Sequence, residues 1–205
     1  GSEFITSILV VPEISTMLEA EKLSALIACG TLIITIFGIG LTCTTMSSIS
    51  LEGTNLWIKK TLPVSEKEIF KAKIISNLIL TIPAAILSNI IFYMALKFDV
   101  IYLMLNIIIA IVFLVLNAVL GLLINVYFPK LDWSNPTVVV KQSAAVFIGI
   151  VVTFASIALP IAVFLLLKVE NILMFLSFLA IIFLALLFIT WNILMTKGVK
   201  QFKML

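Results

Sequence analysis

The side chains that could act as nucleophiles are two cysteines, Cys29 and Cys43, together with many serines and threonines. In catalysis these groups usually rely on a neighbouring base, most often histidine, and the chain contains no histidine. The lack of histidine also excludes histidine-based zinc sites and acid–base chemistry. No phosphate-binding loop of the Walker type occurs, so the chain cannot hydrolyse ATP alone. We therefore expect a protein that is not an enzyme and that has no catalytic residues, no metal ion and no cofactor.

Both cysteines fall in the same apolar stretch of the chain. In a helix that rises 1.5 Å per residue, the distance between them along the axis is about 21 Å. A disulfide needs Cα atoms within about 7 Å, so Cys29 and Cys43 cannot bridge each other. We interpret them as thiols that face lipid or neighbouring helices.

Five long apolar stretches contain no aspartate, glutamate or lysine, and the chain has no arginine. These stretches cover 23–50, 74–96, 100–128, 143–167 and 172–196. A bilayer core about 30 Å thick needs about 20 helical residues, and every stretch reaches that length. With 63% hydrophobic and 11% charged residues, the composition lies outside the range of soluble domains. The sequence predicts an all-α, polytopic helical membrane protein with five transmembrane helices and short outer loops.

The amino end of the chain has a different character. Residues 1–4 (Gly-Ser-Glu-Phe) look like the remnant of a cloning site, and we exclude them from the fold. No methionine follows them directly, so we expect Ile5 to mark a cut inside a longer natural chain. We interpret 5–22 as an outer segment and 23–205 as one transmembrane domain.

Lysines divide the segments between the spans into two groups. Ten of the 13 lysines lie in 51–73, 129–142 and 197–205. The other three are Lys22, Lys97 and Lys168. Positive-inside bias predicts that the lysine-rich segments are cytoplasmic, with the amino end outside and the carboxyl end inside. We expect a multi-pass protein of the cytoplasmic membrane, in contact with the lipid bilayer, and no nucleic acid as a partner.

The segment 51–73 carries helix stop and start signals. Pro63 cannot continue a helix, whereas Ser65 begins a capping box in which the Glu68 side chain reaches back to the Ser65 amide. Beyond it, Ile69 and Phe70 lie between lysines. This pattern predicts an amphipathic helix that lies at the membrane surface before the chain enters the next span.

A second short amphipathic piece, Leu56–Lys60, precedes Pro63. Two interpretations of the whole segment remain open on spacing alone. In the first it is a solvated basic loop, anchored to the membrane by Trp57. In the second it is a docking element for a cytoplasmic partner, in which Trp57 and Leu62 provide apolar contacts and the lysines steer the approach.

Together with the spans on either side, segment 51–73 resembles the permease subunits of type-2 ABC transporters, most of which are exporters. The matching residues are Ser47–Gly53, the Leu-Pro-Val-Ser step Leu62–Ser65, Glu68–Lys73 and, in the second lysine-rich segment, Phe128–Asn135. The resemblance covers nearly the whole chain, and its motifs are short and moderately specific.

The resemblance implies a bacterial permease with six spans per half, of which the five visible spans are the second to the sixth. It implies a cytoplasmic coupling helix in 51–73 that docks on a separate ATP-binding cassette subunit. The implied docking residues are Glu52, Trp57, Leu62, Pro63, Ser65, Glu68, Phe70 and Lys71. One such unit cannot enclose a pathway with two faces, so we also expect a second permease half or a homodimer.

From these observations we expect the membrane-spanning part of an ATP-driven ABC transporter, and an exporter in direction. An alternative is a non-transporting membrane scaffold or assembly factor that holds a partner on its basic cytoplasmic face. A secondary carrier is disfavoured, because such proteins usually keep a charged side chain at membrane depth.

Five asparagines also lie at membrane depth: Asn77, Asn89, Asn106, Asn117 and Asn125. Asn117 and Asn125 are eight residues apart and differ by about 80° around the helix axis, so they are candidate lining residues of a translocation pathway. The alternative is helix–helix hydrogen bonding, which is worth roughly 0.6 kcal/mol per pair in bilayers. Pro83 and Pro160 are expected to kink their spans.

Overall fold

The computed structural model describes residues 2–61, 63–166 and 171–205, without the side chains of 2–18, 39, 59 and 60. Every element in this part of the chain is helical. In chain order the elements are α1 (Ser2–Gly40), η1 (Thr44–Met46), η2 (Ser50–Asn55), α2 (Leu56–Thr61), α3 (Glu66–Leu96), α4 (Val100–Tyr127), α5 (Pro136–Gln142), α6 (Ala144–Leu166), α7 (Ile172–Ile193), η3 (Leu194–Gly198) and α8 (Val199–Met204).

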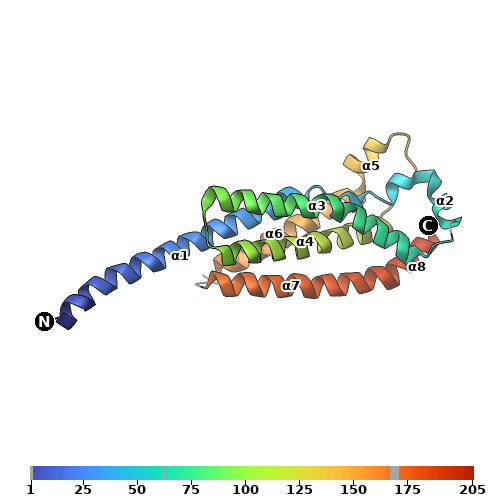
Figure 1. Cartoon of the computed structure of the whole chain (residues 1–205). Coiled ribbons are helices and arrows are strands. Elements are labelled where there is room, and N and C mark those ends of the chain that lie inside the picture. Colours follow the sequence, from blue (N-terminus) through green and yellow to red (C-terminus); the bar gives the residue numbers. More distant parts are fainter. Residues whose placement is uncertain (1, 62, 167–170) are drawn as a thin grey trace.

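The described residues contain five helical segments that are long and apolar enough to cross a membrane. Two of them are α3 and α4, and the other three are Glu19–Gly38, Pro136–Leu166 and Ile172–Met204. They form one elongated bundle with the amino end of the chain at one end and the carboxyl end at the other (Figure 1). The all-α fold is confirmed, and the five apolar helices indicate a multi-pass membrane protein.

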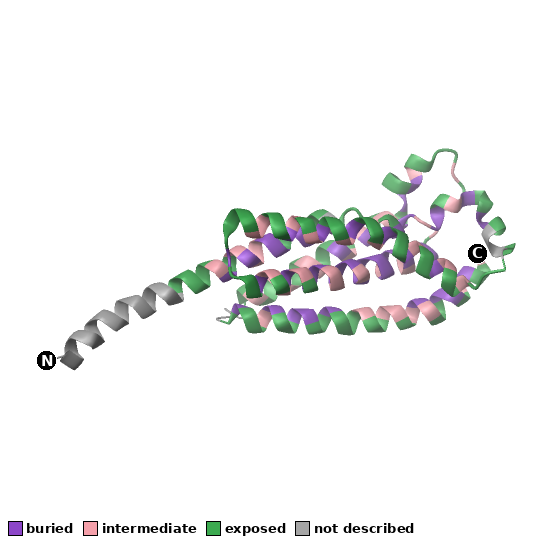
Figure 2. Ribbon diagram, viewed as in Figure 1, coloured by how far each residue is buried: buried purple, intermediate pink, exposed green. Residues whose placement is uncertain are grey.

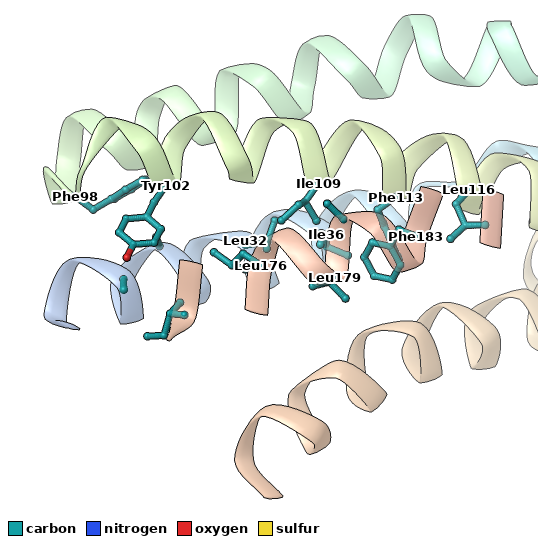
Figure 3. Close-up of a cluster of buried hydrophobic side chains, with 14 residues drawn as sticks. Leu32, Ile36, Phe98, Tyr102, Ile109, Phe113, Leu116, Leu176, Leu179 and Phe183 are labelled. Atoms are coloured by element: carbon teal, nitrogen blue, oxygen red, sulfur yellow. The ribbon is translucent and has the colours of Figure 1, made fainter. Parts of the chain in front are cut away.

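Helix α4 forms the centre of the bundle and contacts α1, α3, α6 and α7. It is the most buried of the five long helices, and α6 is the least buried (Figure 2). The largest cluster of buried apolar side chains joins α4 to α1 and α7 (Figure 3). Within it the rings of Phe113 and Phe183 lie 5.4 Å apart, centre to centre.

Large apolar side chains are exposed along the outward faces of α3, α6 and α7. Leu80, Phe147 and Phe188 are each about 70% exposed. So many large exposed apolar side chains are rare on a soluble monomer. They form the surface expected of helices whose backbone groups are bonded internally and whose side chains contact lipid.

The first apolar stretch is not one helix from 23 to 50. Helix α1 starts upstream, at Ser2, and ends at Gly40, after which the chain continues in short turns. These turns contain hydrogen bonds of their own, such as the Ser47 amide to the Thr44 carbonyl at 3.4 Å, and they also bond to a neighbouring helix. The amide and hydroxyl of Thr44 both donate to Asn77 Oδ1 of α3, at 2.9 Å. Threonine and serine side chains favour such non-helical backbone, which explains the early end of the helix.

The capping box predicted at Ser65 is confirmed. The Glu68 amide donates to Ser65 Oγ at 3.4 Å, and the Ser65 amide donates to Glu68 Oε2 at 2.7 Å. The helix that starts there differs from the expected surface helix, because it continues unbroken to Leu96 as α3. The amphipathic residues after Ser65 are therefore the first turns of a long helix, and Pro83 lies inside it.

The other lysine-rich segments also contain more helix than the sequence pattern predicted. Asn135 caps α5 by accepting from the Thr137 amide at 3.0 Å, and Pro136 occupies its first turn. The helical run that starts at Ile172 continues past the expected boundary at 196, through the π-helical turn η3 and α8 to Met204.

Candidate partner-docking end of the bundle

The three lysine-rich segments come together at one end of the bundle. Helices α2, α5 and α8, together with the turns beside them, lie at this end, which is also where the chain terminates (Figure 1). Lys97 lies in the connection between α3 and α4 at the opposite end. The clustering predicted from the sequence is thus present in the fold. We call this region the lysine-rich end.

The start of η2 is held in place by hydrogen bonds that converge on its first residue, the buried Ser50. Asn125 Oδ1 of α4 accepts from the amides of Ile49 and Ser50, at 2.7 and 3.1 Å, and Asn125 Nδ2 donates to Ser50 Oγ at 2.7 Å. The Lys130 amide also donates to Ser50 Oγ, at 2.9 Å, and Trp133 Nε1 donates to the Ser50 carbonyl, at 2.7 Å. We call Ser50, Asn125, Lys130 and Trp133 the Ser50 node. It joins the start of η2, where the first lysine-rich segment begins, to α4 and to the second lysine-rich segment.

Gly53 lies against the Trp133 ring. Its backbone adopts φ 53° and ψ −135°, a conformation that L side chains rarely adopt. A Cβ at this position would lie 3.0–3.2 Å from three atoms of the Trp133 indole. Glycine is therefore required here for the backbone conformation and for the close approach. Two of the motifs that carry the family resemblance, Ser47–Gly53 and Phe128–Asn135, are therefore in direct contact.

Glu52 forms an ion pair with Lys73 at the base of α3. Lys73 Nζ lies 2.6 Å from Glu52 Oε1 and donates to the Ser48 carbonyl at 2.7 Å. The two side chains are only 11% and 13% exposed. The carboxylate of Glu52, one of the implied docking residues, thus attaches η2 to α3.

Helix α2 has one attached face and one open face. Leu56 is 5% exposed and belongs to a buried cluster with Phe70, Val126 and Leu194. The next residue, Trp57, is 63% exposed. Four more of the implied docking residues are exposed between α2 and α3 and in the first turns of α3: Pro63, Ser65, Glu68 and Lys71. Leu62, also implied, lies outside the described residues.

Glu68 lies in the first turn of α3, before the apolar stretch that starts at Ile74. The backbone amide of Ser65, then its hydroxyl, hold the pKa of the Glu68 carboxyl below its ordinary value. Lys71, one turn further on, acts in the same direction. The exposed surface beside α2 therefore carries a fixed negative charge at the helix start and a positive charge beyond it.

Phe70 is not exposed. Its side chain is 0% exposed and packs edge-on against Phe202 of α8, with the ring centres 5.3 Å apart. Lys203 of the same short helix pairs with Glu66 at 3.5 Å. Phe70 thus holds α8 against the base of α3, and in this conformation it offers no surface to a partner. The sequence pattern did not reveal that α8 covers Phe70, and the docking role of Phe70 stays a prediction.

Asn117 and Asn125 are buried, at 4% and 0% exposure. Asn117 Nδ2 donates to the Gly40 carbonyl of α1 at 3.0 Å, and Asn117 Oδ1 accepts from Thr153 Oγ1 of α6 at 2.9 Å. Asn125 belongs to the Ser50 node. Both side-chain amides therefore link α4 to neighbouring parts of the same chain. Their role in lining a pathway stays a prediction.

From the sequence, no docking or structural role was predicted for four residues of this end: Ser50, Lys73, Trp133 and Phe202. The first three offered a weak signal, because they lie in motifs that carry the resemblance, whereas Phe202 offered none. The partner of Lys73 depends on the path of the irregular chain between α1 and α2, and no periodic pattern describes that path.

Comparisons with family models, with curated proteins and with solved structures gave no match to this chain.

Proposed function

We propose that this chain is the membrane-spanning permease part of an ATP-driven transporter of the type-2 ABC exporter class. In this proposal it lies in the bacterial cytoplasmic membrane with its lysine-rich end in the cytoplasm. There it docks a separate ATP-binding cassette subunit through α2 and the start of α3. The observation that carries the proposal is an exposed tryptophan, Trp57, on a short helix whose other face is fixed to the bundle.

The connections of α2 suit the transmission of movement. Helix α2 directly follows η2, and η2 is bonded to α4 through Asn125 and to α3 through Lys73. A partner that displaces α2 would therefore pull on the ends of α3 and α4 together. Such coupling is the task of a permease helix that converts ATP binding in a partner into rearrangement of the transmembrane helices.

The rest of the pathway is proposed to come from a second permease half or a second copy of this chain. A single bundle arranged around one central helix, α4, has a packed interior, whereas a transport pathway needs two opposing faces. The outward apolar faces of α3, α6 and α7 provide surface for lipid and for such a second half.

The proposal is tested by co-expressing the full-length protein with candidate ATP-binding cassette subunits and measuring ATP hydrolysis in lipid. Trp57→Ala is expected to weaken the complex about fivefold or more, because truncating a central aromatic contact typically costs more than about 1 kcal/mol. The control is Phe178→Ala, which removes an aromatic side chain of similar exposure, 60%, on α7. This variant is expected to keep the affinity and the ATPase rate of the wild type.

Other outcomes would favour other functions. If Trp57→Ala leaves both complex formation and ATPase stimulation unchanged, the docking proposal is wrong. A partner that binds at the lysine-rich end without any nucleotide-dependent activity would instead indicate a membrane scaffold. Substrate movement driven by an ion gradient, with no nucleotide present, would indicate a secondary carrier.

A further inference from the structure

The bundle contains an apolar groove between α1, α6 and α7. Its volume is about 310 Å³, and the residues described along it include Leu26 and Gly30 of α1, Pro160 and Phe164 of α6, and Leu176 and Phe183 of α7. A second groove of about 340 Å³ lies between α6 and α7 and shares Pro160 and Phe183 with the first. The space between α6 and α7 is thus hollow on both sides of Pro160.

The groove arises because α6 is held to the bundle mainly near the lysine-rich end. There Thr153 of α6 bonds Asn117 of α4, and Met46 of η1 fills the space over Gly149. Further along α6, beyond Pro160, the contact with α7 is the ring pair Phe164–Phe175, with centres 5.2 Å apart. Figure 3 shows the core side chains of α1, α4 and α7 packed together.

A pocket with both charged and apolar lining residues lies at the end of this groove that is remote from the lysine-rich end, and we call it the polar pocket. It has a volume of about 300 Å³ and is lined by Glu21, Lys22, Tyr102 and Asn171, among others. Helical spacing connects it with the groove, because side chains three or four residues apart share a face. On α1 the series Lys22, Leu26, Gly30 starts in the polar pocket and continues into the groove.

The dimensions of the groove favour a hydrocarbon chain. A cavity of about 150 Å³ holds one benzene molecule, so about 310 Å³ offers room for roughly a dozen carbon atoms. A helix of a second protein copy, about 10 Å in diameter, is too thick for that space. The groove also lies among helices that face the bilayer, where acyl chains are the abundant apolar solute.

The charged residues of the polar pocket determine which lipid headgroup would bind there. Glu21 and Lys22, which carry a carboxylate and an ammonium, both line this pocket together with Tyr102 and Asn171. This arrangement is complementary to a headgroup that carries both a phosphate and an amine, because Lys22 can pair with the phosphate and Glu21 with the amine.

We propose that the chain binds one zwitterionic glycerophospholipid, with an acyl chain in the groove between α1, α6 and α7 and its headgroup at Glu21 and Lys22. The site belongs to the leaflet opposite the lysine-rich end. It does not depend on the docking of an ATPase, and neither proposal stands or falls with the other.

The test uses the full chain in lipid and a phosphatidylethanolamine whose acyl chain carries a photoactivatable diazirine. The cross-linked peptides are then identified by mass spectrometry. We expect the cross-links to concentrate on the parts of α1, α6 and α7 that line the groove. The variant Gly30→Phe fills the groove. A Cβ added at Gly30 meets no atom within 4 Å, so a side chain can start at this position without a clash.

Gly30→Phe is expected to lower this cross-linking about tenfold, the factor that corresponds to displacing roughly two methylene groups from an apolar site. The matched control is Gly38→Phe, also on α1, where an added Cβ likewise meets no atom within 4 Å. This control is expected to label like the wild type. Lys22→Gln is expected to reduce the labelling by phosphatidylethanolamine, without changing the elution volume of the protein.

Two results would overturn the proposal. One is labelling spread evenly over the outward faces of α3, α6 and α7, unchanged by Gly30→Phe, which would identify ordinary lipid contact. The other is a Gly30→Phe variant that dissociates a dimer while keeping its lipid cross-links, which would identify the groove as an interface between two copies.

Discussion

At the scale of single residues, the lysine-rich end is organised by Ser50. Its hydroxyl accepts two hydrogen bonds from groups that belong to different parts of the chain, Asn125 Nδ2 and the Lys130 amide. Ser50 itself is 0% exposed. A buried donor that loses its acceptor keeps the full cost of its desolvation, so the removal of one oxygen atom affects two donors at once.

We therefore predict that Ser50→Ala lowers the stability of the protein by about 1–3 kcal/mol for each donor that stays unpaired. The measurement is the thermal unfolding midpoint in detergent. The control is Ser76→Ala, because the exposed hydroxyl of Ser76 bonds only the Ala72 carbonyl of its own helix. An equal midpoint for Ser50→Ala and the wild type would show that the Ser50 node does not hold this end together.

At the scale of the elements, the connection between η2 and α3 rests on the Glu52–Lys73 pair. The two side chains are largely but not fully shielded from solvent, so removing one partner is expected to cost between the about 0–1 kcal/mol of an exposed pair and the about 3–5 kcal/mol of a buried one, whereas replacing both partners is often nearly neutral. We predict that Glu52→Gln and Lys73→Met each lower the unfolding midpoint, and that the double variant recovers most of the loss. Additive losses in this double-mutant cycle would contradict the pairing.

The element boundaries show which parts of the fold are readable from the sequence. Helix α4 was predicted to within one residue, because its apolar stretch is bounded by Asp99 on one side and Pro129 on the other. The start of α3 followed from its capping box at Ser65. The end of α1 was not readable, because it depends on hydrogen bonds from Thr44 to Asn77 of another helix.

The proposed docking surface was likewise predictable from the sequence only in part. Exposure of Trp57 and of the capping residues follows from local amphipathic patterning, and the structure places these side chains at the surface. Burial of Phe70 depends on α8, which comes from the far end of the chain. Long-range packing of this kind leaves no periodic trace in the segment 51–73.

At the scale of the whole molecule, charge is distributed along one axis. Ten of the 13 lysines lie in the three segments gathered at one end, and the apolar helices separate that end from Lys22 and Lys97. ATP and ATP-binding subunits are cytoplasmic, so the proposed function requires the lysine-rich end to face the cytoplasm. The positive-inside bias points in the same direction.

This orientation can be measured by labelling single cysteines with a membrane-impermeant thiol reagent, in a Cys29→Ala/Cys43→Ala background. Trp57→Cys reports on the lysine-rich end and Lys97→Cys on the opposite end, since both positions are exposed. We predict that the reagent labels Lys97→Cys in intact cells, and Trp57→Cys only after the membranes are opened. Labelling of Trp57→Cys in intact cells would place α2 outside the cell and would contradict a cytoplasmic docking surface.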